Sequence, residues 1–174
     1  MVLMPHILLG LACTKPSVSS APEGTTAAVL AYEVEVGGEA VEDAPEAFRA
    51  AVNSALGQVG VTANPLSVEG REVLNAHTPT QQLDALGAPE DELAVVLRTE
   101  ARFYSQLNGR FRWVVMVDST VAPVGKPEDA LTESFEVPVF LQFQHQDADD
   151  AIDAAAPVVD PKLRRMVGTV AAGL

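Results

Sequence analysis

The 174-residue sequence predicts an α+β (α/β) fold, a two-layer sandwich in which helices cover one face of a mixed sheet of about five strands. Three observations predict it. Several segments alternate apolar and polar residues with the period of a strand, and others place apolar residues at helical spacing. These segments follow one another as strand, helix, strand, short helix, three-strand meander and helix. With 48% hydrophobic and 20% charged residues, the chain is expected to fold rather than to be acidic and disordered.

The first strand and the first helix are predicted from their apolar faces. Thr26–Val36 begins as an apolar run and ends in alternation, with Glu33 and Glu35 on the face opposite its apolar residues. The spacing Asp43-Ala-Pro-Glu46 is that of a capping box, and it predicts a helix that runs to about Val59. The apolar stripe of this helix consists of Phe48, Ala51, Val52, Ala55, Leu56 and Val59.

Two weaker elements follow the first helix. Val61–Val68 is predicted as a strand, and Pro65 within it indicates a position at the edge of the sheet. Thr78 or Thr80 is expected to cap a short helix that runs through Leu86 and ends at the glycine that follows.

The clearest feature is a hairpin of two strands, Leu93–Gln106 and Arg110–Ala122. A two-residue Asn-Gly turn would mix charged and aromatic side chains on both faces, although one face has to be buried. A three-residue loop instead pairs Gln106 with Arg110 and gives Gly109 the left-handed conformation that glycine adopts at little cost. We predict this second register, with Trp113 in the core beneath the first helix. The buried face then holds Leu97, Ala101, Phe103, Phe111, Trp113, Val115 and Val117, and the other face holds Arg98, Glu100, Arg102, Tyr104, Arg110 and Arg112.

The C-terminal part is predicted as an edge strand followed by two helices. Ser134–Gln144 alternates apolar and polar residues, and Pro138 indicates an edge strand or a bulge. Asp147–Ala156 is predicted as one short helix. Asp160-Pro161 is predicted to begin another, because proline is favoured at the first helical position. The apolar stripe of this last helix consists of Leu163, Met166, Val167 and Val170.

The N-terminus has the pattern of an exported, lipid-anchored protein. Residues 1–12 are almost all apolar and suit the core of a signal peptide, and they precede Cys13, the only cysteine of the chain. Small residues before a cysteine resemble a bacterial lipobox, in which the cysteine is lipidated. Residues 13–25 are rich in Ser, Pro, Gly and Thr, as in a flexible tether, and residues 26–174 would form one periplasmic domain. The alternative is a buried cysteine in a short apolar segment. Thr14 after the cysteine, rather than Asp, favours the outer membrane by the same resemblance.

A second resemblance covers roughly Thr26 to Ala122. The stretch from Leu83 to Arg98, followed by an Asn-Gly hairpin and by Trp113-Val-Val-Met-Val-Asp118, resembles a recurring envelope module. That module is shared by curli-secretion-type lipoproteins, lipoprotein activators of penicillin-binding proteins, and the N-terminal domain of the Tol-system periplasmic protein. The resemblance implies the same two-layer fold, and it implies a protein that binds other envelope proteins or builds assemblies rather than an enzyme.

The sequence contains no pattern that predicts a catalytic site, a metal site or a cofactor. His6, His77 and His145 lack the spacing of zinc ligands, and a lone cysteine cannot form an internal disulfide. The acidic run from His145 to Asp153 lacks the glycine turn of a calcium loop, and it is better explained by aspartates at a helix N-terminus. Glu33 and Glu35 resemble paired catalytic carboxylates, but their strand positions place them in solvent.

The distribution of charge predicts one surface for a partner. The chain has 24 Asp and Glu against 11 Lys and Arg, a net charge of −13, which disfavours nucleic acid as a partner. Residues 98–126 nevertheless contain five Lys and Arg and two acidic residues. Arg98, Arg102, Arg110 and Arg112, beside Tyr104, are therefore expected to form a basic partner-binding face on the hairpin. The alternative is a solvated face whose arginines pair with Glu100 or Glu136.

Together these features predict an outer-membrane lipoprotein that faces the periplasm. It would bind another envelope protein as an assembly factor or regulator, with the lipid as its contact with the membrane. A self-associating structural subunit is the alternative from a second class. A small hydrolase acting on envelope material is a third, which would need convergent acid–base or nucleophilic groups in a pocket.

Overall fold

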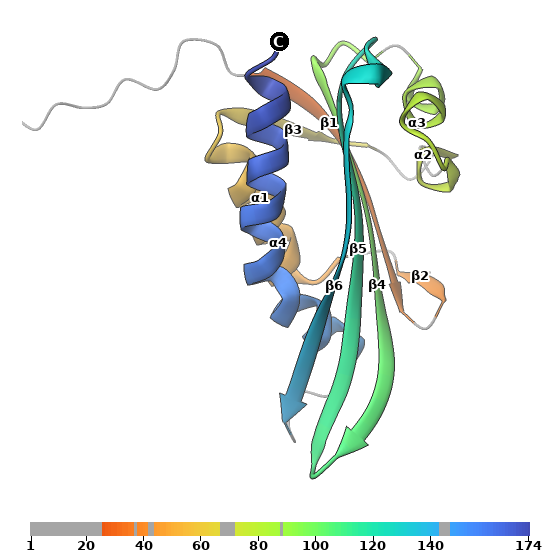
Figure 1. Ribbon diagram of the computed structural model, residues 1–174, viewed down its shortest axis with the longest axis vertical. Helices are drawn as coiled ribbons and strands as arrows, with labels where there is room; N and C mark the ends of the chain where they lie inside the picture. The colour runs from red at the N-terminus through yellow and green to blue at the C-terminus, as the bar shows by residue number, and fades with distance from the viewer. Residues whose placement is uncertain (1–25, 37, 42–43, 67–71, 88, 143–146) are drawn as a thin grey trace, which may run out of the picture.

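The computed structural model describes residues 26–36, 38–41, 44–66, 72–87, 89–142 and 147–174. Six strands form one mixed sheet in the order β2-β1-β4-β5-β6, and β3 also pairs with β1 (Figure 1). The fold class is confirmed. The strands are β1 Thr26–Val36, β2 Glu39–Val41, β3 Val61–Pro65, β4 Leu93–Leu107, β5 Arg110–Pro123 and β6 Leu131–Gln142. The helices are α1 Glu46–Gly57, α2 Glu72–Asn75, α3 Pro79–Leu86 and α4 Ala148–Ala171, with a short 3₁₀ turn at Pro127–Asp129.

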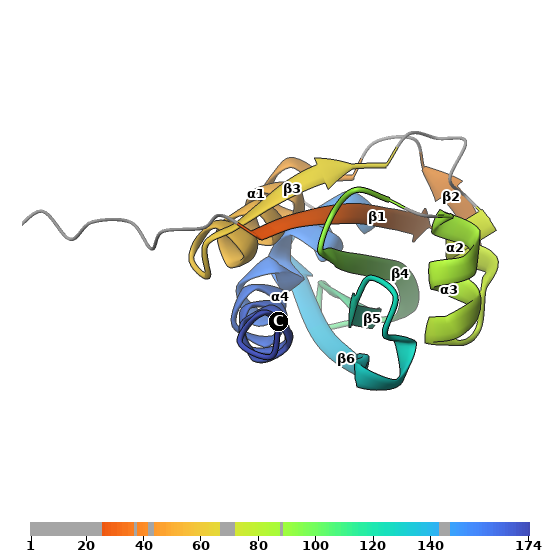
Figure 2. The ribbon, with the colours of Figure 1, turned by 90° about the horizontal axis from the view of Figure 1, so that it is seen from above.

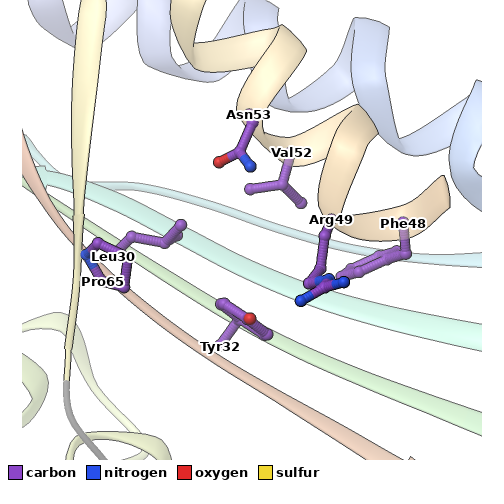
Figure 3. Close-up of a pocket in the computed structure, with 7 residues that line it drawn as sticks. All are labelled: Leu30, Tyr32, Phe48, Arg49, Val52, Asn53 and Pro65. Carbon is purple, nitrogen blue, oxygen red and sulfur yellow. The ribbon is translucent and has the colours of Figure 1, made fainter. Parts of the chain in front are cut away.

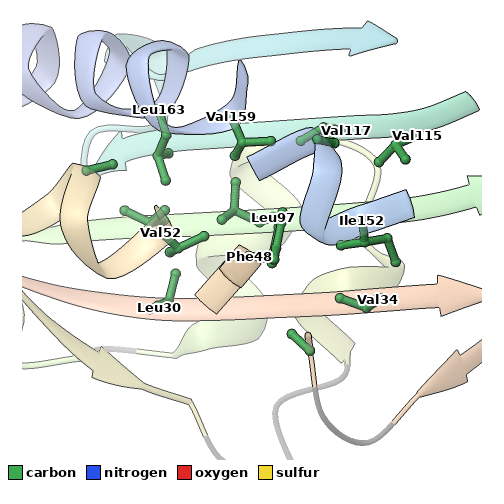
Figure 4. Close-up of a cluster of buried hydrophobic side chains, with 14 of the residues drawn as sticks. Leu30, Val34, Phe48, Val52, Leu97, Val115, Val117, Ile152, Val159 and Leu163 are labelled. Carbon is green, nitrogen blue, oxygen red and sulfur yellow. The ribbon is translucent and has the colours of Figure 1, made fainter. Parts of the chain in front are cut away.

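The main core lies between the sheet and two helices, α1 and α4, which pack side by side on one face (Figure 2). Phe48 of α1 and Ile152 and Leu163 of α4 are fully or almost fully buried there against Leu97 and Val117 of the sheet (Figure 4). Each such side chain contributes about 1.5–3 kcal/mol relative to an exposed one. This layer therefore supplies most of the driving force for folding.

The two short helices lie on the opposite face of the sheet, a placement that the sequence analysis did not predict (Figure 2). Leu83 of α3 packs with Ala94 of β4, and Val73 of α2 packs with Val96 of the same strand. The physical reason is visible in the strands themselves. Ala28–Ala31 and Leu93–Leu97 are buried at every position, and a strand with continuous apolar residues is covered on both faces. The end of β5 is similar, since Val121–Pro123 are all buried and Ala122 packs with Leu83.

The hairpin turn differs from the predicted three-residue loop. Leu107 pairs with Arg110, so Asn108 and Gly109 alone form the turn, with φ angles of 51° and 72°. Two positive φ angles define the tight turn that matches the twist of a hairpin. A β-bulge between Phe103 and Ser105 then shifts the register by one residue. Beyond this bulge the predicted register is confirmed. Phe103 pairs with Trp113, Ala101 with Val115, and Leu97 with Ser119.

The C-terminal segment forms one helix of 24 residues, so the prediction of two helices was wrong. Pro157 and Pro161 lie inside it. An interior proline removes a backbone hydrogen bond and usually ends or kinks a helix. Here the apolar stripe keeps its helical spacing through both prolines, from Ile152 through Val159 to Met166, and all three side chains are buried. Tertiary packing along the whole length of the helix offsets the lost hydrogen bonds.

The other predicted boundaries are largely as expected. The Thr78 side chain caps α3 by accepting a hydrogen bond from the Gln81 backbone N–H, and Gly87 ends the helix with a φ of 75°. β3 and β6 lie at the edges of the sheet, as their prolines predicted. The predicted capping box did not give α1 its cap. Its N-cap residue is Pro45, which makes no side-chain cap, and Asp43 lies outside the described residues.

Candidate functional site

The solvent face of the central strands carries paired charges rather than a uniformly basic patch. Arg98 of β4 donates a hydrogen bond of 2.6 Å to the Glu35 carboxylate of β1, the neighbouring parallel strand. This carboxylate raises the pKa of the Arg98 guanidinium above its usual value. Arg98 is therefore engaged within the protein. The predicted partners were Glu100 and Glu136, and Glu35 was not among them.

Arg102 is engaged in the same way. Its guanidinium donates two hydrogen bonds, of 2.5 and 2.7 Å, to the Glu100 carboxylate two residues earlier on the same face of β4. The Glu100 carboxylate also raises the pKa of Arg102. Such a pair at the surface adds little stability, but it leaves less positive charge for a partner. Two of the four arginines in the predicted basic face are thus already matched by carboxylates.

The other two arginines lie at the end of the hairpin, among exposed aromatic residues. Arg112 lies over the Phe140 ring of β6, 5.8 Å from its centroid, and no ion pair is seen for Arg110 or Arg112 within the described part of the chain. Tyr104 is 73% exposed because it is the residue of the bulge, outside the regular pairing. We define the hairpin tip as the six residues Phe103, Tyr104, Leu107, Arg110, Arg112 and Phe140.

The hairpin tip contains a shallow pocket and a ring pair. The pocket has a volume of about 230 Å³ and is lined by Tyr104, Arg112, Trp113, Val114, Pro138 and Phe140. Phe103, Leu107 and Phe140 are 53%, 48% and 57% exposed, so large apolar side chains face solvent on both sides of the strands. Phe103 also meets Trp113 edge to face, with 5.5 Å between ring centroids. Clustered exposed aromatics beside arginine are typical of interaction surfaces.

Trp113 lies at the margin of the core instead of in its centre. It is partly buried and packs against the core cluster, but its Nε1–H is buried without a hydrogen-bond partner in the described structure. The helix that packs on β5 is α4, whereas α1 packs on α4 and β3. The prediction that the Phe48 helix covers Trp113 was therefore wrong. The hairpin extends past the end of the helical layer, so its distal aromatics are incompletely covered (Figure 1).

The remaining candidate residues have structural roles or lie outside the described chain. Asp147 caps α4 by accepting a hydrogen bond of 2.9 Å from the Asp150 backbone N–H, as predicted for this acidic run. Burial and the neighbouring carboxylates raise the pKa of Asp149. No group of three or more His, Cys, Asp or Glu that could hold a metal is seen among the described residues. Cys13 and His145 lie outside them.

His77 is exposed and contributes to a polar groove between α3 and the solvent face of the sheet. The groove has a volume of about 380 Å³, and Arg98, Asp118 and Ser134 also contribute to it. The His77 backbone N–H donates to the Gln81 side chain, 3.2 Å away. No arrangement with a nucleophile or a second imidazole accompanies His77 among the described residues.

A second pocket lies between α1, β1 and β3, and the sequence analysis did not find it (Figure 3). It has a volume of about 200 Å³ and is lined by Leu30, Tyr32, Phe48, Arg49, Val52, Asn53 and Pro65. Arg49 and Asn53 are one helical turn apart, directly beside the apolar stripe. That spacing is a signal that sequence analysis could have used. The outward position of Phe140 in an otherwise alternating strand is a similar signal for the hairpin tip.

Comparison with known proteins gives similarity in fold alone. No family model matches the chain, and no curated protein matches its sequence. Among solved structures, lipoprotein GNA1162 from Neisseria meningitidis is 11% identical with a TM-score of 0.45, covering 80% of this chain and 99% of its own. A minor lipoprotein from Acinetobacter baumannii is 11% identical with a TM-score of 0.38, covering 83% and 94%.

The PelC dodecamer from Paraburkholderia phytofirmans is 14% identical with a TM-score of 0.39, covering 79% of this chain and 88% of its own. At TM-scores below 0.5, such similarities do not carry function from one protein to another. Within the described residues, no helix is both long enough and apolar enough to cross a membrane.

Proposed function

We propose that the protein is a bacterial envelope lipoprotein that binds another envelope protein through the hairpin tip. The observation that carries this proposal is the exposure of Phe103, Tyr104, Leu107 and Phe140 around Arg112. Burying these side chains against a partner would remove large apolar areas from water and give the arginines carboxylates to bind. The proposal narrows the predicted basic face to its distal half, since Arg98 and Arg102 already have partners.

The position of the hairpin tip suits a protein attached by its N-terminus. Ala28 pairs with Leu93, so the first residues of β1 lie beside the start of β4, and the turn lies at the other end of the molecule (Figure 1). A strand of 15 residues spans about 50 Å. If Cys13 carries the lipid, the hairpin tip points away from the attachment point. This geometry supports a protein partner rather than the anchoring membrane itself.

Charge indicates the chemistry of the partner. The chain has a net charge of −13, and the hairpin tip contributes two arginines and no carboxylate. A partner with an acidic surface would be attracted to this end and repelled by the rest of the protein. Long-range attraction of this kind raises the association rate at low salt. We therefore expect binding through the hairpin tip to weaken as the salt concentration rises.

The binding proposal is tested by photocrosslinking in cells. A photoreactive phenylalanine analogue at Tyr104 or Phe140 should yield one crosslinked envelope protein, identified by mass spectrometry. The same analogue at Val158, which is 40% exposed on α4, is the matched control and should not yield it. The double variant Arg110→Gln/Arg112→Gln should then slow association with that protein. Arg98→Gln/Arg102→Gln should change it less, because those arginines are already paired.

Equal crosslinking at Val158 and at the hairpin tip would rule out a specific surface there. A crosslink to a second copy of this chain would instead support the alternative of a self-associating subunit. Light scattering over a range of concentrations would then show an increasing mass.

Lipidation is tested separately from binding. In cells grown with an alkyne fatty acid, the full-length protein should incorporate the label, and the variant Cys13→Ser should not. Stable attachment to a membrane needs more than one acyl chain. If Cys13 carries several, the labelled protein should be found in the membrane fraction. Equal labelling of both forms would show that Cys13 is not the lipid site. Fractionation of inner and outer membranes would then test the predicted outer-membrane location.

A further inference from the structure

The edge of the sheet beside α1 has a gap in its strand pairing. β3 pairs with Thr26–Leu30 of β1, and β2 pairs with Val34–Val36 on the same edge. The residues between them pair with β4 on the other edge, and no described strand pairs with them on this one. The Leu30 carbonyl accepts a hydrogen bond from the Leu66 N–H on this edge. Because backbone groups alternate along a strand, the N–H and C=O of Tyr32 face the same edge. Among the described residues, no hydrogen-bond partner of these two groups is seen on this edge.

The second pocket lies directly at this gap. Its floor is formed by Leu30 and the Tyr32 ring, its sides by Val52 and Pro65, and Arg49 and Asn53 stand at its rim (Figure 3). A volume of about 200 Å³ is suited to one apolar side chain, since a 150 Å³ cavity already accepts benzene. The main chain of Tyr32 and the pocket therefore offer a strand edge and a side-chain site side by side.

Arg49 adds a positive charge to this arrangement. Its side chain has no ion-pair partner in the described part of the protein, and in Figure 3 it extends from α1 toward the strands. An arginine at the rim of an apolar pocket matches a ligand that carries a carboxylate next to an apolar group. The C-terminal residue of a peptide has this combination, together with a main chain that can pair with a strand edge.

We propose that this pocket binds the C-terminal residue of an extended peptide. The apolar side chain of that residue enters the pocket, its α-carboxylate binds Arg49, and its main chain hydrogen-bonds to Tyr32. This site is separate from the hairpin tip. It is formed by α1, β1 and β3, whereas the hairpin tip is formed by β4, β5 and β6. The test of this pocket is therefore independent of the test of binding through the hairpin tip.

The test compares two labelled peptides of sequence Gly-Ser-Ser-Thr-Val-Leu, one with a free C-terminal carboxylate and one with a C-terminal amide. Fluorescence anisotropy should show that wild-type protein binds the acid about tenfold more tightly than the amide. The variant Arg49→Gln should bind the acid peptide about tenfold more weakly than wild type does. Its affinities for the acid and the amide peptide should then be equal. Lys126→Gln removes an exposed positive charge outside both proposed sites, and it should keep the full preference for the acid.

Two further measurements examine the pocket and the strand edge. Asn53→Trp places a large ring at the rim from an exposed helix position and should abolish binding while circular dichroism stays unchanged. Hydrogen exchange at the Tyr32 amide should slow when the acid peptide is bound. The proposal is overturned if the acid does not bind at about 1 mM. It is equally overturned if the amide binds as tightly as the acid, or if Arg49→Gln keeps the preference.

Discussion

The backbone N–H of Phe48 donates a hydrogen bond of 3.0 Å to Oδ1 of Asp153, a residue 105 positions later in the chain. Phe48 is the third residue of α1, and its amide is one of the first four that a helix leaves without an internal partner. Pro45 at the N-cap supplies no side-chain acceptor. The start of α1 is thus capped by a side chain of α4, which joins the two helices of the main layer.

Removing this cap should destabilise the protein. We expect Asp153→Ala to lower the free energy of unfolding by about 1–2 kcal/mol, because a partly buried amide loses its acceptor. Asp153→Asn keeps an acceptor oxygen and should cost less. Asp160→Asn on the same helix is the matched control, since no side-chain hydrogen bond of Asp160 is seen in the described structure. Urea unfolding measures all three, and equal stability of Asp153→Ala and wild type would contradict the role.

The ion pairs of Glu133 make part of the stability depend on pH. Lys162 donates a hydrogen bond of 2.6 Å to Glu133, Arg165 donates another, and both lower the pKa of the Glu133 carboxyl. A lowered pKa in the folded state adds stability above the unfolded value of about 4.3, and this stability is lost as the pH falls through the folded pKa. Glu133→Gln should therefore be less stable than wild type at pH 7 and equal to it at low pH.

Thermal unfolding from pH 7 down to about pH 3 measures this difference. Glu128→Gln is the control, because Glu128 is exposed and no ion pair is seen for it in the described part of the chain. If the stability difference between Glu133→Gln and wild type does not change with pH, the charge of the Glu133 carboxylate is not the cause of that difference.

At position 113, we expect substitution by alanine to lower the stability of the fold and substitution by phenylalanine to change it little. Trp113→Ala removes a partly buried ring and its contact with Phe103, and we expect a loss of about 2 kcal/mol, below the 3–5 kcal/mol of a fully buried aromatic. Trp113→Phe also removes the buried Nε1–H that has no partner, and it should change stability by less than about 1 kcal/mol. Denaturant unfolding distinguishes the two. A loss above about 3 kcal/mol for Trp113→Ala would indicate a central core position instead.

The tight turn requires its glycine. Gly109 has a φ of 72°, where a side chain is strained, so Gly109→Ala should cost about 1 kcal/mol. Asn108 has a φ of 51°, and Asn108→Gly should be nearly neutral because glycine adopts this conformation readily. Equilibrium unfolding of both variants, with Ser105→Ala as a control outside the turn, tests this. A neutral Gly109→Ala would contradict the positive φ at this position.

The alternation of apolar and polar residues predicts the register of the hairpin away from the turn, but not at the turn itself. The burial of Leu97 and Val115 requires one alternation, and the sequence alone predicts the pairing of Phe103 with Trp113. A one-residue slip would turn every one of these side chains to the other face. Near the turn no such burial applies, so the two-residue Asn-Gly geometry prevails. The bulge at Tyr104 absorbs the difference. The same bulge exposes the residue that the proposed binding surface needs.

By itself, the sequence determined five of the six strands and the first helix, because these depend on neighbours a few residues apart. The short strand β2 was not predicted, and Phe103 of the predicted buried face is exposed. The tertiary structure decided which charges are free. Arg98 is neutralised by Glu35, 63 residues away, because β1 pairs in parallel with β4. It also decided that α4 continues through two prolines, that Asp153 caps α1, and that Arg49 and Tyr32 line the same pocket. Each of these depends on packing between segments that are distant in the sequence, and the local periodicity of residues carries no information about such packing.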